Sequence, residues 1–246
     1  MATPQVLSRS PIIEALVDVR AEVAQPISVL QALAEEFRTD FPKTKESRIV
    51  KAELKVEGGR LVAPQALDLG LQGLQLFNAD DSLAVQFKLD GLTVNNMKAY
   101  IGGEQLIDRT LALWRVFASR AQVTSTSRIA MRYINKLELP FAAGDDFRRF
   151  LTASPELPDE VPGHFSEFLT RVMAHGDVPN GPTIIVTQSL VNTGSKPAVV
   201  IDLDAFKIGE FSADPDFLAG VLQELMALAK RVFFSLITEE TARLYL

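Results

Sequence analysis

The 246-residue chain contains no cysteine. This absence excludes a disulfide framework, a zinc site built from thiolates and a cysteine nucleophile, and it fits a reducing compartment. The chain has two histidines, His164 and His175, which are too few for a histidine metal site and lack HExxH spacing. We expect both histidines in surface loops or turns, and we predict no metal site.

Several signatures of catalysis and nucleotide binding are also missing. The sequence contains no GxSxG elbow, no Walker loop and no Rossmann glycine fingerprint. Without such a constellation we predict no catalytic residue and no cofactor, which favours a protein that is not an enzyme.

Long uninterrupted apolar runs and an excess of positive charge are absent too. The most apolar stretch, Leu218–Ile237, contains Glu224, Lys230 and Arg231, which are costly inside a bilayer, so no membrane span is predicted. The first residues lack the pattern of a secretory signal, and we expect a cytoplasmic protein. The net charge of −6 repels phosphate polymers, so nonspecific nucleic-acid binding is not expected.

The sequence divides into two similar halves, residues 1–122 and 123–246. Three pairs of segments recur in the same order and at nearly one spacing, namely Val17–Val23 with Tyr133–Leu139, Ala84–Asp90 with Ala198–Asp204, and Arg115–Phe117 with Arg231–Phe233. Period-2 alternation predicts strands, and apolar residues at helical spacing predict helices. The predicted strands are 13–23, 48–56, 60–63, 73–78, 83–92, 128–139, 165–174, 183–192 and 197–208, and the predicted helices are 27–37, 104–119, 145–151 and 215–236.

This element order predicts an α+β fold of two β-α-β-β-β-α halves. Sequential hairpins favour a mostly antiparallel sheet with the helices on one face. The halves form either one continuous sheet or two sheets related by a pseudo-two-fold axis. The element order resembles the saddle of the TATA-binding protein, a resemblance that carries no function.

Parity along the strands predicts which side chains occupy the face without helices. That face combines both signs of charge along the predicted strands, including Asp18 and Glu138. A surface for DNA would be basic, so the mixed charge argues against a DNA saddle. The face is either a solvated sheet with cross-strand ion pairs or a binding surface, for which the candidate residues are Arg20, Lys88, Asp90, Arg128, Arg132, Lys136, Asp202 and Asp204.

Asp202 and Asp204 suggest one alternative. Two carboxylates at i and i+2 of a strand point to the same side, as in sites that hold magnesium. Arg128, Arg132 and Lys136 would then bind a phosphate beside them, in a nucleotide-binding module or a Mg-dependent enzyme. The repeat offers lysine and aspartate at the corresponding positions, which weakens this interpretation.

Three short motifs resemble a known family. Ser10–Ala15, Arg132–Lys136 and Phe233–Glu240 together look like a sporadically distributed bacterial family of uncharacterised proteins of about this length. The resemblance spans nearly the whole chain and implies no activity or catalytic residues. The patchy distribution of that family would suit a component of a defence, mobile-element or toxin-neutralising system.

Together these features favour a non-enzymatic binding or assembly protein. Mixed charge on an open face gives specificity for a partner more than raw affinity. We therefore expect the partner to be a protein, either another chain or a second copy of this one.

Overall fold

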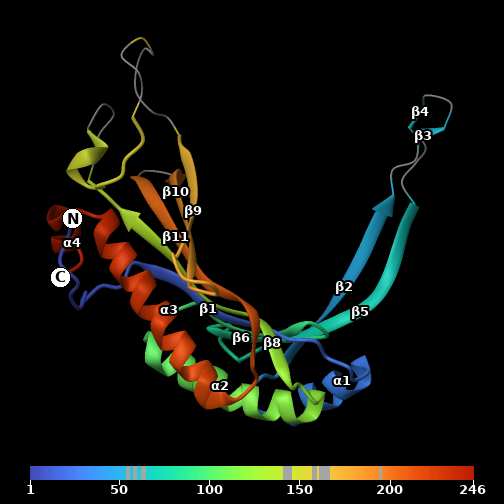
Figure 1. Ribbon diagram of the computed structural model, residues 1–246. Coiled ribbons are helices and arrows are strands. Elements are labelled where there is room, and N and C mark those ends of the chain that lie inside the picture. The colour runs from blue at the N-terminus through green and yellow to red at the C-terminus, as the bar shows by residue number, and fades with distance from the viewer. Residues whose placement is uncertain are drawn as a thin grey trace.

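Figure 1 shows the computed structural model, which describes residues 1–53, 56–57, 60–61, 65–140, 146–156, 160, 167–193 and 196–246. In chain order its elements are β1 (Ile12–Arg20), α1 (Ile27–Glu36), β2 (Lys43–Glu53), β3 (Val56–Glu57), β4 (Arg60–Leu61), β5 (Gln65–Phe77), β6 (Leu83–Lys88), β7 (Gly91–Asn96), α2 (Gly103–Ala121), β8 (Ser125–Glu138), the 3-10 helix η1 (Phe147–Arg149), β9 (Leu169–His175), β10 (Thr183–Thr193), β11 (Lys196–Ser212), α3 (Pro215–Leu236) and α4 (Glu239–Arg243).

Nine of these strands form one continuous sheet in the order β2-β5-β6-β7-β1-β8-β11-β10-β9. Every pairing in it is antiparallel. The predicted α+β class with a mostly antiparallel sheet is therefore confirmed. β1 and β8, which are the first strands of the two predicted halves, lie side by side at the middle of the sheet.

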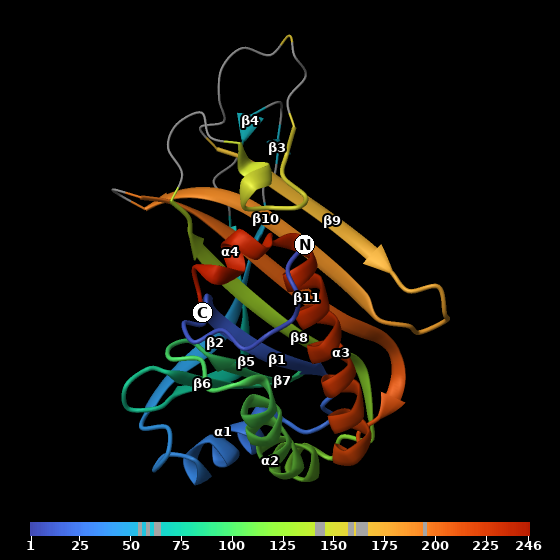
Figure 2. The ribbon, with the colours of Figure 1, turned by 90° about the vertical axis from the view of Figure 1, so that its left-hand side faces the viewer.

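The helices lie on one side of the sheet, and the sheet curves away from them (Figure 1). α1 packs on β5 and β6, α2 on β7 and β1, and α3 on β8 and β11. The helix-free side is the concave face of the sheet, and its outer strands rise on either side of the centre (Figures 1 and 2). This concave face is the face that parity leaves to polar side chains.

The core lies between the sheet and the helices. Val17 and Val19 of β1 and Met131 of β8 are fully buried, as the alternation predicts. On the helix side, Trp114 is also fully buried, and its indole Nε1 donates a hydrogen bond to the carbonyl of Ala213 at 2.8 Å. α2 and α3, the last long helices of the two predicted halves, contact each other beneath the sheet.

The start of α3 follows directly from its sequence. The Asp214 side chain accepts hydrogen bonds from the backbone N–H groups of Asp216 and Phe217 at 2.9 and 3.1 Å, and Pro215 occupies the first turn. Both features satisfy or remove donors that a helix N-terminus leaves unpaired. The predicted start of this helix is confirmed.

The predicted strand 83–92 is wrong in one respect, because the chain turns at Leu89–Asp90 and forms β6 and β7. The turn brings Gly91 against β1 with φ at +136°, and a Cβ there would lie 2.0 Å from the carbonyl oxygen of Val19. Only glycine fits this close approach without moving the backbone. Asp90 consequently lies in a turn and not on a strand.

Three other expectations are corrected. Ile13, predicted to face the core, is 49% exposed, because the register of β1 against β8 shifts between Ile12 and Glu14. Instead of the helix 145–151, the structure has the short helix η1, and Asp145 lies outside the described residues, as does His164. The matched segments Ala84–Asp90 and Ala198–Asp204 also occupy different places, because β11 adjoins β8 whereas β7 separates β6 from β1.

Two glycines give opposite predictions for stability. Gly91→Ala should lower the free energy of unfolding by more than about 1 kcal/mol, because it combines positive φ with a backbone clash. Gly220→Ala, in α3 with open space around its Cβ position, should raise it by about 0.5–1 kcal/mol. Urea denaturation measures both, and equal effects of the two substitutions would contradict the packing of β7 on β1.

Candidate functional site

The predicted binding residues converge on the centre of the concave face. Lys88 comes from β6, Arg20 from β1, Arg128, Arg132 and Lys136 from β8, and Asp202 and Asp204 from β11. Asp90 reaches the same group from the turn after β6, where it pairs with Arg20. Strand order and parity together therefore collect these eight side chains on one surface.

Asp18 of β1 is the centre of this group, and it is only 5% exposed. Its Oδ1 accepts hydrogen bonds from Thr93 Oγ1 at 2.6 Å and from Lys88 Nζ at 3.1 Å. Its Oδ2 accepts from Arg20 Nε at 2.9 Å and from Arg128 Nη1 at 3.0 Å. Three cations from three strands thus meet one nearly buried carboxylate.

Arg128 extends the network to β11. Its Nη2 lies 3.0 and 2.9 Å from the two carboxylate oxygens of Asp204. Its guanidinium also lies over the ring of Phe206, 4.7 Å from the centroid, which adds a cation–π contact. Arg128 therefore joins the carboxylates of Asp18 and Asp204 and is fixed from three directions.

Arg132 forms a second, separate pair on the same face. Its Nε and Nη2 lie 2.7 and 2.5 Å from the two oxygens of Asp202, which is the bidentate geometry that arginine favours with carboxylates. Lys136 lies farther along β8, with its Nζ 3.8 Å from Glu138. The Arg132 side chain is 40% exposed, so this pair reaches solvent.

The two central carboxylates have pKa values shifted in opposite directions. Burial alone raises the pKa of Asp18, but the charge of Lys88 and the hydrogen bonds from Thr93 and Arg20 outweigh it and lower the pKa. For Asp204 burial prevails over the charges of Arg128 and Arg132, and its pKa is raised. The hydrogen bond with Asp202 raises the pKa of Arg132.

Sequence reasoning placed Asp18 on this face but left it out of the binding candidates, and it did not identify Thr93 or Phe206. Parity gives the side of the sheet to which a side chain points, but it does not give the neighbouring strands. The long-range pairing of β1 with β8 is what brings Arg128 to Asp18. The sequence did contain one signal for the importance of Asp18, because this charged residue interrupts the apolar run Leu16–Val19.

The carboxylates of Asp202 and Asp204 do point to one side, as predicted for a metal pair. Each is engaged by its own arginine, so a magnesium ion would have to displace Arg132 and Arg128. Across the described parts of the chain, no three metal-ligating side chains gather into a group that could hold an ion. The arrangement fits an ion-pair network better than a metal site.

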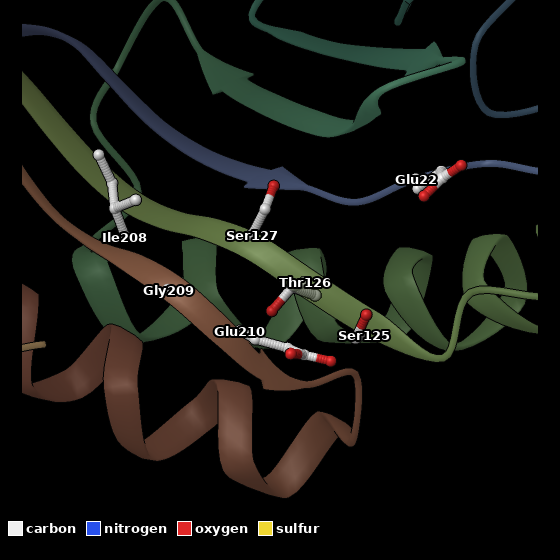
Figure 3. Close-up of a pocket in the computed structure, with 7 residues that line it drawn as sticks. All are labelled: Glu22, Ser125, Thr126, Ser127, Ile208, Gly209 and Glu210. Atoms are coloured by element: carbon white, nitrogen blue, oxygen red, sulfur yellow. The ribbon is translucent and has the colours of Figure 1, made fainter.

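A pocket of about 520 Å³ opens near the start of β8 (Figure 3). It offers hydroxyl and carboxylate oxygens and is lined by Glu22, Ser125, Thr126, Ser127, Ile208, Gly209 and Glu210. None of the predicted binding residues lines it. Its lining has no cation to bind a phosphate, and we assign it no function.

The chain matches no protein-family model and no curated protein. The motifs Ser10–Ala15, Arg132–Lys136 and Phe233–Glu240 lie at the start of β1, in β8 and across the end of α3 into α4. Their resemblance to a sporadic bacterial family stays a prediction. Among the described helices, none is both long and apolar enough to cross a membrane.

Removal of the central charge should weaken the fold. Asp18→Asn leaves Arg20, Lys88 and Arg128 facing one another without their shared anion, and we expect a loss of about 2–3 kcal/mol in unfolding free energy. Fully buried pairs lose about 3–5 kcal/mol, but Arg20 and Arg128 reach solvent. In urea denaturation the exposed control Glu22→Gln should change stability by less than about 0.5 kcal/mol, and an equal effect of both would refute the central role of Asp18.

The opposite pKa shifts predict opposite pH effects. Asp18 stabilises the fold at pH values above the pKa of an unfolded aspartate, and this contribution disappears as the pH falls through its lowered native pKa. For Asp204 the sign is reversed, because its raised native pKa favours folding as the pH falls. Carboxyl ¹³C NMR titration should give a midpoint below about 3.9 for Asp18 and above it for Asp204. Coincident midpoints would contradict this assignment.

Proposed function

We propose that this chain is a non-enzymatic binding protein that engages a protein partner through the concave face. The observation that carries the proposal is the set of ion pairs on a face that no described helix covers. One network joins Lys88, Asp18, Arg128 and Asp204, and Arg132 with Asp202 forms a separate pair beside it. The network holds its side chains in fixed positions before any partner binds, which reduces the entropy lost on binding.

The charge of the face favours a protein over a nucleic acid. Arg128 and Arg132 are already paired with Asp204 and Asp202, so few free positive charges remain for phosphates. The chain also carries a net charge of −6. A partner with its own mixed charges would be selected by complementarity. The resemblance to a sporadic bacterial family supports a place in a defence, mobile-element or toxin-neutralising system.

The proposal includes a pseudo-two-fold relation between the two halves, comparable to the saddle of the TATA-binding protein. The central position of β1 beside β8 supports it, with β7 and β11 flanking them. The match between β6 and β11 gives it no support, because these strands are not equivalent in the sheet order. A saddle of this kind would present one concave surface contributed by both halves.

The alternative is a nucleotide- or phosphate-binding module, or a Mg-dependent enzyme, at Asp202, Asp204, Arg128, Arg132 and Lys136. Arg128 and Arg132 lie beside Asp204 and Asp202 on one face, and this proximity of cations to a pair of carboxylates favours the alternative. Binding of a phosphate or magnesium ion there would require the pairs Arg128–Asp204 and Arg132–Asp202 to separate, which costs free energy.

Charge reversal tests the protein-partner proposal. We expect Arg132→Glu with Lys136→Glu to weaken partner binding at least about tenfold, or 1.4 kcal/mol, in pull-downs from the host followed by titration with the purified partner. The matched control, Arg115→Glu with Arg231→Glu, makes the same change of charge at exposed positions on α2 and α3 and should bind normally.

A second variant separates binding from folding. Arg132→Asp with Asp202→Arg exchanges the two charges and retains an ion pair, so circular dichroism and the melting temperature should stay near wild type while binding is lost. Full binding by both concave-face variants would refute the proposal.

Thermal-shift measurements test the alternative. A ligand at 100 times its dissociation constant stabilises a protein by about 2.7 kcal/mol. We expect nucleotides with magnesium to produce no such shift. A shift that disappears in Arg132→Glu with Lys136→Glu but persists in Arg115→Glu with Arg231→Glu would favour the phosphate ligand instead.

A further inference from the structure

The two edges of the nine-stranded sheet differ in their side chains. β2 forms one edge, and charged residues along an edge discourage pairing with another chain. The exposed charged residues of its described part are Lys43, Lys45, Glu46 and Arg48. This edge is therefore protected against association.

β9 forms the opposite edge (Figure 2), and Arg171 is the one arginine, lysine or acidic residue along it. Its side chains of Leu169, Val172 and Met173 are 73%, 61% and 50% exposed. Within the described residues β9 pairs with β10 alone. An apolar edge strand of this kind is a template for the addition of another strand.

The backbone hydrogen bonds at its two ends establish which groups point outward. The N–H of Leu190 donates to the carbonyl of Phe168, and the N–H of Gly176 donates to the carbonyl of Pro182, both at 3.0 Å. Hydrogen-bonded pairs alternate along an antiparallel ladder, so the even-numbered residues of β9 face β10. The N–H and C=O groups that point away from the sheet belong to Leu169, Arg171, Met173 and His175.

We propose that β9 pairs with β9 of a second copy in antiparallel orientation, with the two-fold axis at Val172. In this register Arg171 lies opposite Met173 of the second copy, and Leu169 lies opposite His175. These pairs join outward-pointing residues and therefore exchange two hydrogen bonds each. The two Val172 side chains meet at the axis as a non-hydrogen-bonded pair.

Charge and strand overlap select this register over its neighbours. Arg171 is the one arginine, lysine or acidic residue of β9. An axis at Arg171 would set the two arginines directly opposite each other, which destabilises a sheet. An axis at Met173 would pair only residues 171–175 of the two strands, whereas the axis at Val172 pairs all seven residues of β9. The axis at Val172 also places each arginine opposite a methionine.

This contact uses the edge of the sheet, so it goes beyond the proposed function of the concave face. It would join two nine-stranded sheets into one. The dimer should therefore persist in the concave-face variant Arg132→Glu with Lys136→Glu, so that failure of either proposal can be distinguished from failure of the other.

Cysteine cross-linking tests the register, because the chain has no native cysteine. Val172→Cys should form a disulfide-linked dimer on mild oxidation, since a non-hydrogen-bonded pair has its Cα atoms about 4.5 Å apart and disulfides span about 4.4–6.8 Å. The control Ala174→Cys lies on the same strand and points to the same side. Its two copies would lie four residues apart, about 13 Å, and should not link. Absence of the Val172 link, or equal linking by both variants, would overturn the proposal.

Analytical ultracentrifugation with charge variants tests the same contact without oxidation. The wild-type protein should sediment at twice the mass of one chain at high concentration. Met173→Lys sets a lysine opposite Arg171 of the second copy and should weaken the dimer at least about tenfold. Adding Arg171→Glu creates two glutamate–lysine pairs and should restore it. A monomeric wild type, an unaffected Met173→Lys dimer or a failed restoration would each overturn the proposal.

Discussion

Asp18 carries a negative charge at a position that water barely reaches. The surrounding structure depends on pairing this carboxylate with cations. Burial of an isolated carboxylate costs several kcal/mol, so the position requires cations close by. Lys88, Arg20 and Arg128 supply them from β6, β1 and β8. Their geometry requires these strands to keep one register. A slip of β1 by one residue would move Asp18 into the core and Val17 and Val19 onto the concave face. Core packing and ion pairing thus specify the same alignment.

The same network determines what the concave face can present to a partner. Its central charges are largely satisfied by one another, so the face offers a fixed and balanced pattern instead of a strong field. The exposed end of this pattern is Arg132, held by Asp202 in bidentate geometry. Such a surface gains specificity from position and sign, since a misplaced charge on a partner would meet repulsion or lose solvation. This property suits recognition of one protein more than binding of a uniform polymer.

A repeating pattern in the sequence predicts local features of the fold, such as the side of a strand to which a residue points. Alternation along β1 and β8 gave the correct side for Val17, Arg20 and Arg132, and Asp214–Pro215 gave the correct start of α3. These are local properties, determined within a few residues. The neighbours of each strand are not local. The break at Leu89–Asp90 reflects the approach of Gly91 to Val19, and the bulge that exposes Ile13 reflects pairing with β8. Both depend on contacts between residues far apart in the chain.

The edge and the face of the sheet can recognise different partners because they offer different chemical groups. Inside the sheet, backbone N–H and C=O groups are used by neighbouring strands, so the concave face can recognise a partner through side chains alone. At β9 the outward backbone groups of Arg171 and Met173 are available, and hydrogen bonds to another strand require no charge. The ion pairs of the concave face accordingly lie on the central strands, whereas the β9 edge exposes Leu169, Val172 and Met173. A partner protein on the face and a second copy at the edge would therefore not compete for the same groups.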